Sequence, residues 1–197
     1  MLIKEAIIST LNADGSTYLA PMGLQYREPS SEIMTLAPFR PSRTLDNLLR
    51  TPMAIANYTD DVRVFAACLC EKRDWPMRPG KQTPIAYLDA ALTHAELKLS
   101  DFKDDPVRPS FTARIVHQES HAPFTGFNRA QAAVIELAIL VSRLDRLPRE
   151  KYEKEIDYLE TAVKKTAGET EWAAWRQLMQ KVRQHQYPNT PLSLIHI

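Results

Sequence analysis

Residues 36–48 read LAPFRPSRTLDNL, and within them an apolar strand turns directly into a short helix. Pro41 ends the strand, because a proline has no backbone N–H to offer a neighbouring strand. Thr44 is a candidate N-cap for the helix that follows. Leu45 and Leu48 stand three positions apart, so they share a helix face that can pack on a core. The segment therefore predicts a strand-to-helix corner.

The same corner has the composition of an anion-binding site. Two cations and two hydroxyl groups fall within five consecutive residues, at Arg40, Ser42, Arg43 and Thr44. Unpaired N–H groups at a helix N-terminus attract anions, and a phosphate monoester would suit this site. The alternative is purely structural, because serine and threonine commonly cap helices and arginines commonly lie in solvent.

Apolar and β-branched runs of strand length dominate the first part of the chain. Turn signals such as Asn12-Ala13-Asp14-Gly15 separate them. The runs cover residues 2–10, 17–26, 32–39, 53–58, 95–99 and 110–117. About six strands with hairpin spacing are typical of a small barrel.

Proline content changes sharply along the chain. Eleven of the 14 prolines lie at or before Pro123, and residues 124–187 contain only Pro148. This second part shows apolar residues every three or four positions, which predicts three helices, at about 128–144, from Pro148 to Gly168, and through residues 172–182. We predict an α+β fold with a β-barrel domain at 1–122, a three-helix domain at 123–187 and a tail at 188–197.

The last six residues, 192–197, read LSLIHI. CTG TCT CTT ATA CAC ATC encodes this peptide, and that DNA resembles the mosaic-end adapter of transposon-based sequencing libraries. We expect the segment to be a read-through artefact that hides the true C-terminus. The alternative is an ordinary apolar peptide, and in either case we expect no functional residue in this tail.

Charge and hydropathy exclude several function classes. Lys and Arg number 25 against 24 Asp and Glu, so no global field attracts nucleic acid or an anionic membrane. The longest apolar run, residues 132–141, is too short to span a bilayer. The N-terminus has no apolar segment of signal-peptide length. We expect a cytoplasmic protein without nucleic-acid or membrane partners, in which Cys68 and Cys70 are reduced thiols.

Four runs of sequence, taken in order, are more specific than any single motif. They are APMG (20–23), LAPFRPSRTLDNL (36–48), NYTDDVRVFA (57–66) and GFNRAQAAVIELAILVSRL (126–144). Together they resemble an uncharacterised flavoprotein family, catalogued as domain of unknown function 447, over about residues 2–186. The resemblance implies an FMN-binding split β-barrel of the kind found in flavin reductases and pyridoxamine phosphate oxidases, followed by a helical part. It also implies a homodimer with flavin at the subunit interface, and an association with methanopterin-linked one-carbon metabolism.

The resemblance further implies which positions contact the flavin. The phosphate and ribityl contacts would be Arg40, Ser42, Arg43, Thr44 and Asn47. The strand beside the isoalloxazine ring would be Ala20, Pro21, Met22 and Gly23. Gly23 lacks a Cβ atom, so a planar ring can approach its backbone closely. The alternative for Gly23 is a simple strand bulge.

Arg129 opens the first long helix and could neutralise the flavin phosphate or a substrate anion. The alternative is structural, because Glu136 could pair with Arg129 or Arg143 at heptad spacing.

Other polar residues are weaker candidates. His94, His117 and His121 have no HExxH or comparable spacing, so no metal site is expected. Adjacent Asp60 and Asp61 more often indicate a turn or a helix cap than a binding site.

Three function classes remain open at this point. The leading one is a flavin oxidoreductase in which FMN carries the hydride and the protein supplies binding and orientation. The second is a protein that holds FMN as a sensor, carrier or structural cofactor without turnover. The third is a flavin-free interaction module. No catalytic acid, catalytic base or substrate can be named from the sequence.

Overall fold

The computed structural model describes residues 1–70 and 74–188. The tail at 192–197 lies outside the described residues. Contacts between residues divide the chain into two compact units. The first unit contains Met1–Asp60 and Asp74–Phe124, and the second contains the described residues 61–70 and 125–188. The sequence-based division at residue 122 did not separate residues 61–70, which belong with the helices.

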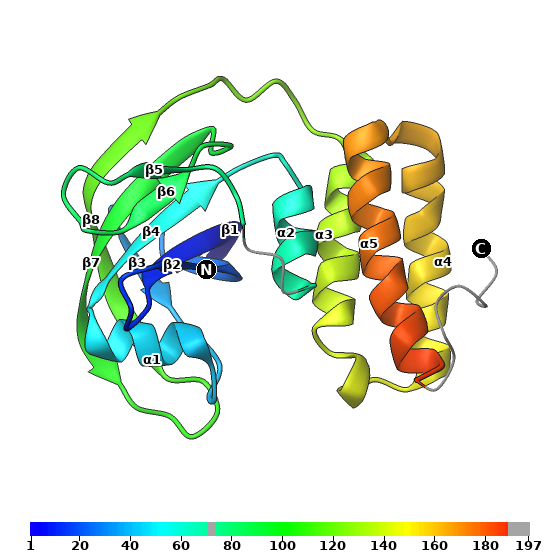
Figure 1. Cartoon of the computed structure of the whole chain (residues 1–197), viewed down its shortest axis with the longest axis horizontal. Coiled ribbons are helices and arrows are strands. Elements are labelled where there is room, and N and C mark those ends of the chain that lie inside the picture. The colour runs from blue at the N-terminus through cyan, green and yellow to red at the C-terminus, as the bar shows by residue number, and fades with distance from the viewer. Residues whose placement is uncertain (71–73, 189–197) are drawn as a thin grey trace. The chain divides into compact units, whose positions relative to one another are not determined.

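Six antiparallel strands close into a barrel in the first unit, in the order β1-β2-β3-β8-β7-β4 (Figure 1). Strand β4 pairs back with β1 and so completes the closure. The strands are β1 (Leu2–Leu11), β2 (Thr17–Tyr26), β3 (Ile33–Leu36), β4 (Met53–Tyr58), β7 (Thr93–Lys103) and β8 (Ser110–Ser120). Each of the six predicted runs is a strand, and the predicted α+β fold, a β-barrel followed by helices, is confirmed.

Alternate residues of each strand point into the barrel and form one apolar core. Ala6 and Ile8 of β1 are fully buried in it. The short helix α1 (Arg43–Arg50) adds Leu45 and Leu48 to the same core, so it closes one end of the barrel. Burying a leucine stabilises a fold by about 1.5–3 kcal/mol, which fixes α1 in place.

The N-cap of α1 is Ser42, not Thr44 as predicted. Ser42 has extended backbone, with φ −159° and ψ 148°, and its Oγ accepts a hydrogen bond from the Leu45 N–H at 3.2 Å. Thr44 lies inside the first turn and is 4% exposed. The prediction missed by two residues because serine and threonine are both strong N-caps.

A short hairpin of β5 (Met77–Pro79) and β6 (Ala86–Leu88) lies over the outer face of β4. Ile85 and Tyr87 of this segment pack with Ile55 of β4 in a second apolar cluster. The hairpin was not predicted. Because the hairpin covers the outer face of β4, side chains on that face can be buried as well.

The second unit is helical. Its helices are α2 (Arg63–Leu69), α3 (Arg129–Val141), α4 (Arg149–Thr166) and α5 (Glu169–Gln186), with one 3-10 turn at Leu144–Arg146. They share one core that includes Leu137, Tyr152, Val163, Trp175 and Leu178. The three predicted helices correspond to α3, α4 and α5, whereas α2 was not predicted.

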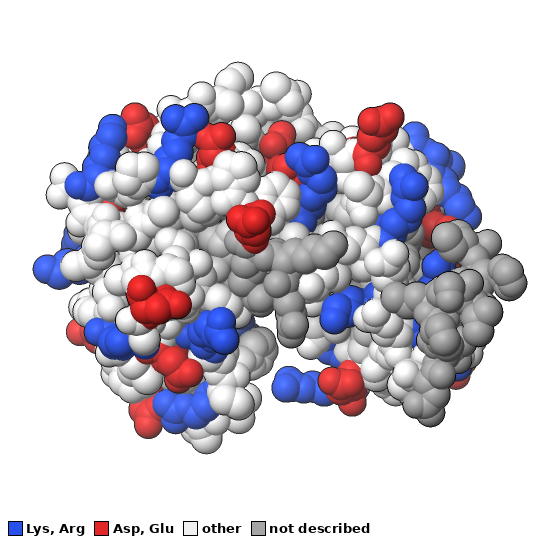
Figure 2. Space-filling view, in the orientation of Figure 1, with Lys and Arg blue, Asp and Glu red and all other residues white. Residues whose placement is uncertain are grey.

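The surface carries mixed charge. On the face shown in Figure 2, Lys and Arg side chains alternate with Asp and Glu side chains and form no continuous basic patch. Within residues 1–70 and 74–188, no helix combines the length and apolar character needed to cross a membrane. Cys68 is buried, and the Cys70 thiol, which is partly buried, donates a weak hydrogen bond to the Gln177 carbonyl oxygen at 3.7 Å.

Candidate functional site

The predicted anion corner lies at the N-terminus of α1. Arg43 is exposed, and its guanidinium lies over the Tyr18 ring, 5.3 Å from the ring centroid. In the described part of the chain, the backbone N–H groups of Arg43 and Thr44 have no hydrogen-bond partner. One guanidinium and two backbone N–H groups are therefore available to an anion.

Asn47 has a structural role in the same corner. Its Nδ2 donates hydrogen bonds to Thr10 Oγ1 and Asn12 Oδ1, each at 3.0 Å. Its Oδ1 accepts a hydrogen bond from Arg50 Nη2 at 2.7 Å. Both ends of the amide are thus used to hold α1 against the end of β1, and Asn47 positions the corner without presenting a free group to a ligand.

Two carboxylates balance the cations of the corner. Arg40 Nη2 forms an ion pair with Asp104 Oδ1 at 2.8 Å. Hydrogen bonds from Ser16, with a smaller contribution from the charge of Arg43, lower the pKa of Asp14. An anion bound here would compete with Asp104 for Arg40, whereas the guanidinium of Arg43 has no such ion pair among the described residues.

The predicted ring-contacting residues, Ala20 to Gly23, lie in the middle of β2. The pairing of β1 with β2 is regular through this stretch, with Gly23 opposite Glu5, so the bulge alternative for Gly23 is wrong. A Cβ atom on Gly23 would come within 2.7 Å of Ile3 Cγ2 and 3.0 Å of Glu5 Oε1. Met22 packs against the barrel core, so Pro21 and Gly23 face outward. Gly23 is therefore a point of close approach on the outer face.

Arg129 lies in the second unit, exposed at the start of α3, whereas the corner belongs to the first unit. Asn128 caps the helix through a hydrogen bond from the Ala130 N–H to its Oδ1 at 2.7 Å. Among the described residues, no ion pair joins Glu136 to Arg129 or Arg143. The structural alternative for Arg129 is therefore not observed. Asp61 accepts a hydrogen bond from the Arg63 N–H at 3.1 Å, which agrees with its interpretation as a turn residue.

A cavity of about 550 Å³ lies at the end of the barrel opposite α1. Tyr58 ends β4 there, and its hydroxyl lies 2.5 Å from the hydroxyl of Tyr26. Burial raises the pKa of both phenols, so the pair is neutral and can donate a hydrogen bond to a ligand. None of the predicted flavin residues lines this cavity or a second one of about 650 Å³ beside His121.

A cluster of imidazole groups was missed from the sequence. This imidazole cluster consists of His94, Glu96, His117 and His121, which strand pairing between β7 and β8 brings together. Burial, with a further contribution from the nearby His121, lowers the pKa of His94. Burial acts to raise the pKa of Glu96, but hydrogen bonds from backbone N–H groups outweigh it and lower that pKa overall. A buried carboxylate thus stands beside a buried neutral ring.

Known proteins resemble this chain in both sequence and fold. The N-terminal domain model of the family described as protein of unknown function (DUF447) matches residues 4–122, and the C-terminal model matches residues 128–180. No curated protein matches the sequence. An FMN-bound protein of the same family from Methanosarcina mazei superimposes with a TM-score of 0.78 at 19% identity, covering 91% of this chain and 94% of that one.

Two more distant structures match a smaller share of the chain. A 2-nitrobenzoate 2-nitroreductase from Pseudomonas fluorescens has a TM-score of 0.52 at 19% identity, covering 59% of this chain and 64% of that one. A flavoredoxin from Methanosarcina acetivorans has a TM-score of 0.52 at 14% identity, covering 60% of this chain and 69% of that one. The two family models together span the barrel and the helices, and the chain belongs to the DUF447 family.

Proposed function

We propose that the protein binds FMN and holds its phosphate at the N-terminus of α1. The observation that supports this best is the pair of unpartnered N–H groups at Arg43 and Thr44 beside the exposed Arg43 guanidinium. Helix N-termini favour phosphate through both hydrogen bonding and the helix dipole. The FMN-bound relative from Methanosarcina mazei, which shares the fold over 91% of this chain, supports the same ligand.

The isoalloxazine ring is proposed to lie along β2. Arg43 contacts Tyr18 near the start of that strand, and Gly23 lies five residues further on. At about 3.3 Å per residue, the two positions are roughly 17 Å apart along the strand. Because they are an odd number of residues apart, their side chains point to opposite faces, so the contact with the flavin would come from the backbone of β2. Ala20, Pro21, Met22 and Gly23 would then offer backbone to the ring, and displacement of the exposed Ile3 side chain would open the close approach at Gly23.

We propose that a second copy of the chain completes this site. Pro21 and Gly23 face outward from β2, and Arg43 is exposed, so a ring bound there has only one wall. Ile3 and Ile33, on the outer faces of the strands that flank β2, are 48% and 40% exposed. Light scattering of the flavin-loaded protein should therefore give a homodimer, about twice the chain mass of 22.5 kDa. A monomer with flavin bound would exclude a shared pocket.

The most economical activity is that of a flavin oxidoreductase. Bound FMN supplies hydride-transfer chemistry, and the protein contributes binding, orientation and electrostatics. Storage of FMN without turnover is the alternative. Reduction of the bound flavin by NADH or NADPH would favour the oxidoreductase. Reduced pterins belong in the same screen, because the family resemblance points to methanopterin-type one-carbon metabolism.

FMN binding predicts a yellow protein. Freshly purified protein should show flavin absorption in the visible range, and denaturation should release a pigment that chromatographs as FMN. The phosphate monoester corner favours FMN over the bulkier diphosphate of FAD. Release of FAD, or a colourless protein even after incubation with FMN and removal of free flavin, would contradict the proposal.

A further inference from the structure

A β-bulge in β8 turns His117 toward the outside of the barrel. The register pairs Leu97 with Ile115 but Glu96 with His117, so Val116 is an extra residue. In a regular ladder without a bulge, Val116 would lie opposite Glu96, and His117 would lie opposite Ala95, whose side chain faces the core. Bulges commonly re-aim a side chain in this way next to functional sites. Here the bulge places an imidazole beside a buried carboxylate.

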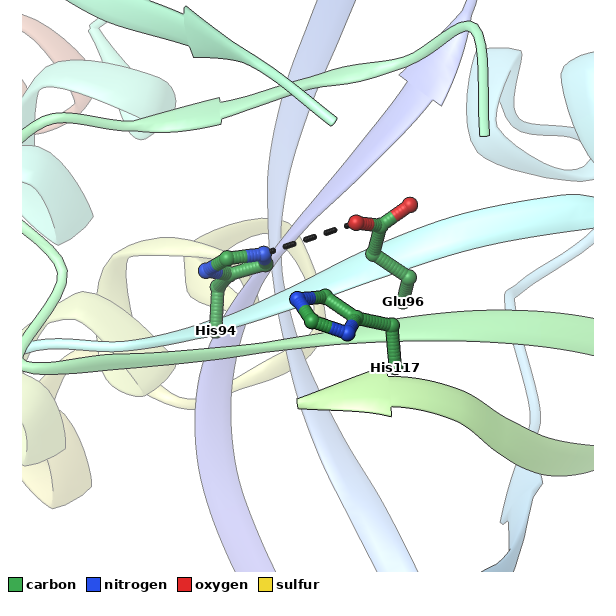
Figure 3. Close-up of side chains that lie close together, drawn as sticks. All are labelled: His94, Glu96 and His117. Carbon is green, nitrogen blue, oxygen red and sulfur yellow. Dashed lines mark ion pairs between the residues drawn. The ribbon is translucent and has the colours of Figure 1, made fainter. Parts of the chain in front are cut away.

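Two ring nitrogens in the imidazole cluster have no hydrogen-bond partner. They are His94 Nε2 and His117 Nε2, both shielded from solvent among the described residues. Glu119 Oε2 lies 3.7 Å from His117 Nε2, too far for a hydrogen bond. The His94 side chain is 0% exposed, and the Tyr87 ring stacks on it with centroids 3.9 Å apart. In Figure 3 the side chains of His94, Glu96 and His117 converge on one point.

Neither tautomer of His94 gives its Nε2 atom a hydrogen-bond partner. His94 Nδ1 and His121 Nε2 are 2.8 Å apart, so one of them donates a proton to the other. If His94 Nδ1 is the donor, the lone pair on His94 Nε2 faces the Glu96 carboxylate. If His121 is the donor, an Nε2–H group of His94 faces Glu96 Oε1 at 3.6 Å, too far for a hydrogen bond. A buried polar group left unpaired costs about 1–3 kcal/mol, so a third species is expected at this point.

Hydrogen bonds fix the position of the Glu96 carboxylate beside the unpaired His94 nitrogen. Its two carboxylate oxygens accept hydrogen bonds from the backbone N–H groups of Lys81 and Gln82, at 2.7 and 2.8 Å. Gly80 makes this loop possible, because a Cβ atom there would come within 2.6 Å of the Ile85 carbonyl oxygen. An ionised carboxylate has about four lone-pair sites, so Glu96 can keep these bonds and still bind a cation.

We propose that His94, Glu96 and His117 form a binding site for a divalent transition-metal ion such as Zn²⁺. The ligand atoms of the three residues lie within 4.8 Å of one another. The 3.6 Å between His94 Nε2 and Glu96 Oε1 is close to the separation of about 3.4 Å expected for two ligands of a tetrahedral ion with bonds of about 2.1 Å. The set leaves one coordination position open for water or a substrate.

The alternative set of His94, Glu119 and His121 is less suitable. In that set, His94 Nδ1 and His121 Nε2 are already bonded to each other, and Glu119 pairs with Lys81 at 2.8 Å. The same His94–His121 bond fits the proposed site, because a metal-bound histidine almost always donates its other N–H to an outer partner. His121 is then a positioning residue.

Zinc titration of the whole protein tests the site. Protein treated with a chelator and then dialysed should bind one Zn²⁺ per chain in calorimetry. Loss of an outer-sphere partner lowers metal affinity about 10- to 100-fold, so loss of a direct ligand in His117→Ala should lower it at least about 100-fold. Glu96→Gln should lose affinity as well. Circular dichroism of each variant checks that the fold is retained.

Two control variants make the result specific. Glu119→Gln removes a carboxylate from the alternative set, and His185→Ala removes an exposed histidine from the helical unit. His185→Ala should bind Zn²⁺ as the wild type does. Glu119 Oε2 lies 3.7 Å from His117 Nε2, so Glu119→Gln should lose less affinity than His117→Ala, as expected for a neighbour of a ligand and not for a ligand. The proposal is overturned if the wild type binds no Zn²⁺, if His117→Ala binds it equally well, or if Glu119→Gln loses binding while His117→Ala retains it. None of these outcomes depends on whether the protein binds FMN.

Discussion

Arg43→Ala should weaken FMN binding roughly 10- to 100-fold and leave riboflavin binding unchanged. The exposed Arg43 guanidinium lies beside the unpartnered N–H groups at the start of α1, where the phosphate is proposed to sit. A hydrogen bond to a charged group contributes about 1.5–3 kcal/mol net, and each 1.4 kcal/mol or so is tenfold in affinity. Riboflavin has no phosphate, so it should not respond. Calorimetric titration of both flavins into the flavin-free protein measures the contrast.

Arg43→Pro separates the backbone from the side chain at this position. Arg43 is the first residue of α1, where a proline is well tolerated, and the extended backbone of Ser42 is compatible with a following proline. The alanine variant removes the guanidinium, and the proline variant removes the guanidinium and the N–H group. FMN should therefore bind roughly tenfold more weakly to Arg43→Pro than to Arg43→Ala if the N–H contacts phosphate.

Other variants show whether the corner is correctly identified. Arg40→Ala should lose less affinity than Arg43→Ala, because Asp104 already pairs with Arg40. Leu49→Ala, an exposed change on the same helix, should leave both flavins unaffected. Equal losses of FMN and riboflavin in Arg43→Ala, or no loss of FMN, would place the phosphate elsewhere, with Arg129 the next residue to replace.

Leu48→Ala should lower the free energy of unfolding of the barrel unit by about 2–5 kcal/mol, as other buried leucine truncations do. Leu48 is 0% exposed and belongs to the core that closes the barrel end. The substitution removes apolar contact and leaves a cavity that a rigid barrel cannot fully close. Urea unfolding followed by circular dichroism measures the loss as a lower transition midpoint.

Leu49→Ala is the matched control for this stability change. Leu49 is the next residue of the same helix and is 51% exposed, so its truncation should change the free energy of unfolding by no more than about 0.5 kcal/mol. Similar losses in both variants would mean that α1 does not close the barrel through Leu48. A stable Leu48→Ala protein would mean the same.

The barrel was predictable because its strands are long and clearly bounded. Strands β2 and β4 have the predicted limits, since turn residues or the preceding helix end stand on either side of each. The hairpin of β5 and β6 was missed because each strand has three residues, too few to show alternation. Helix α2 was missed because five consecutive residues, 64–68, are buried and no side chain caps its start, so the usual one-sided periodicity is absent.

The two candidate sites differ in how far apart their residues lie along the sequence. The α1 corner could be predicted because its residues are consecutive, although the sequence could not show that Asn47 bonds to Thr10 and Asn12. The imidazole cluster could not be predicted, because His94 and His117 are brought together by strand register and one bulge. The expectation of no metal site rested on the spacing of histidines along the chain. That spacing carries no information about residues that come together through the pairing of two strands.

A crystal structure of the protein with FMN would show directly where the phosphate is bound. The phosphate oxygens should lie within hydrogen-bond distance, about 2.7–3.2 Å, of the backbone N–H groups of Arg43 and Thr44 and of the Arg43 guanidinium. The ring should lie along β2 near Gly23. A phosphate bound at the Tyr26 and Tyr58 end of the barrel, or on residues of the helical unit alone, would contradict it.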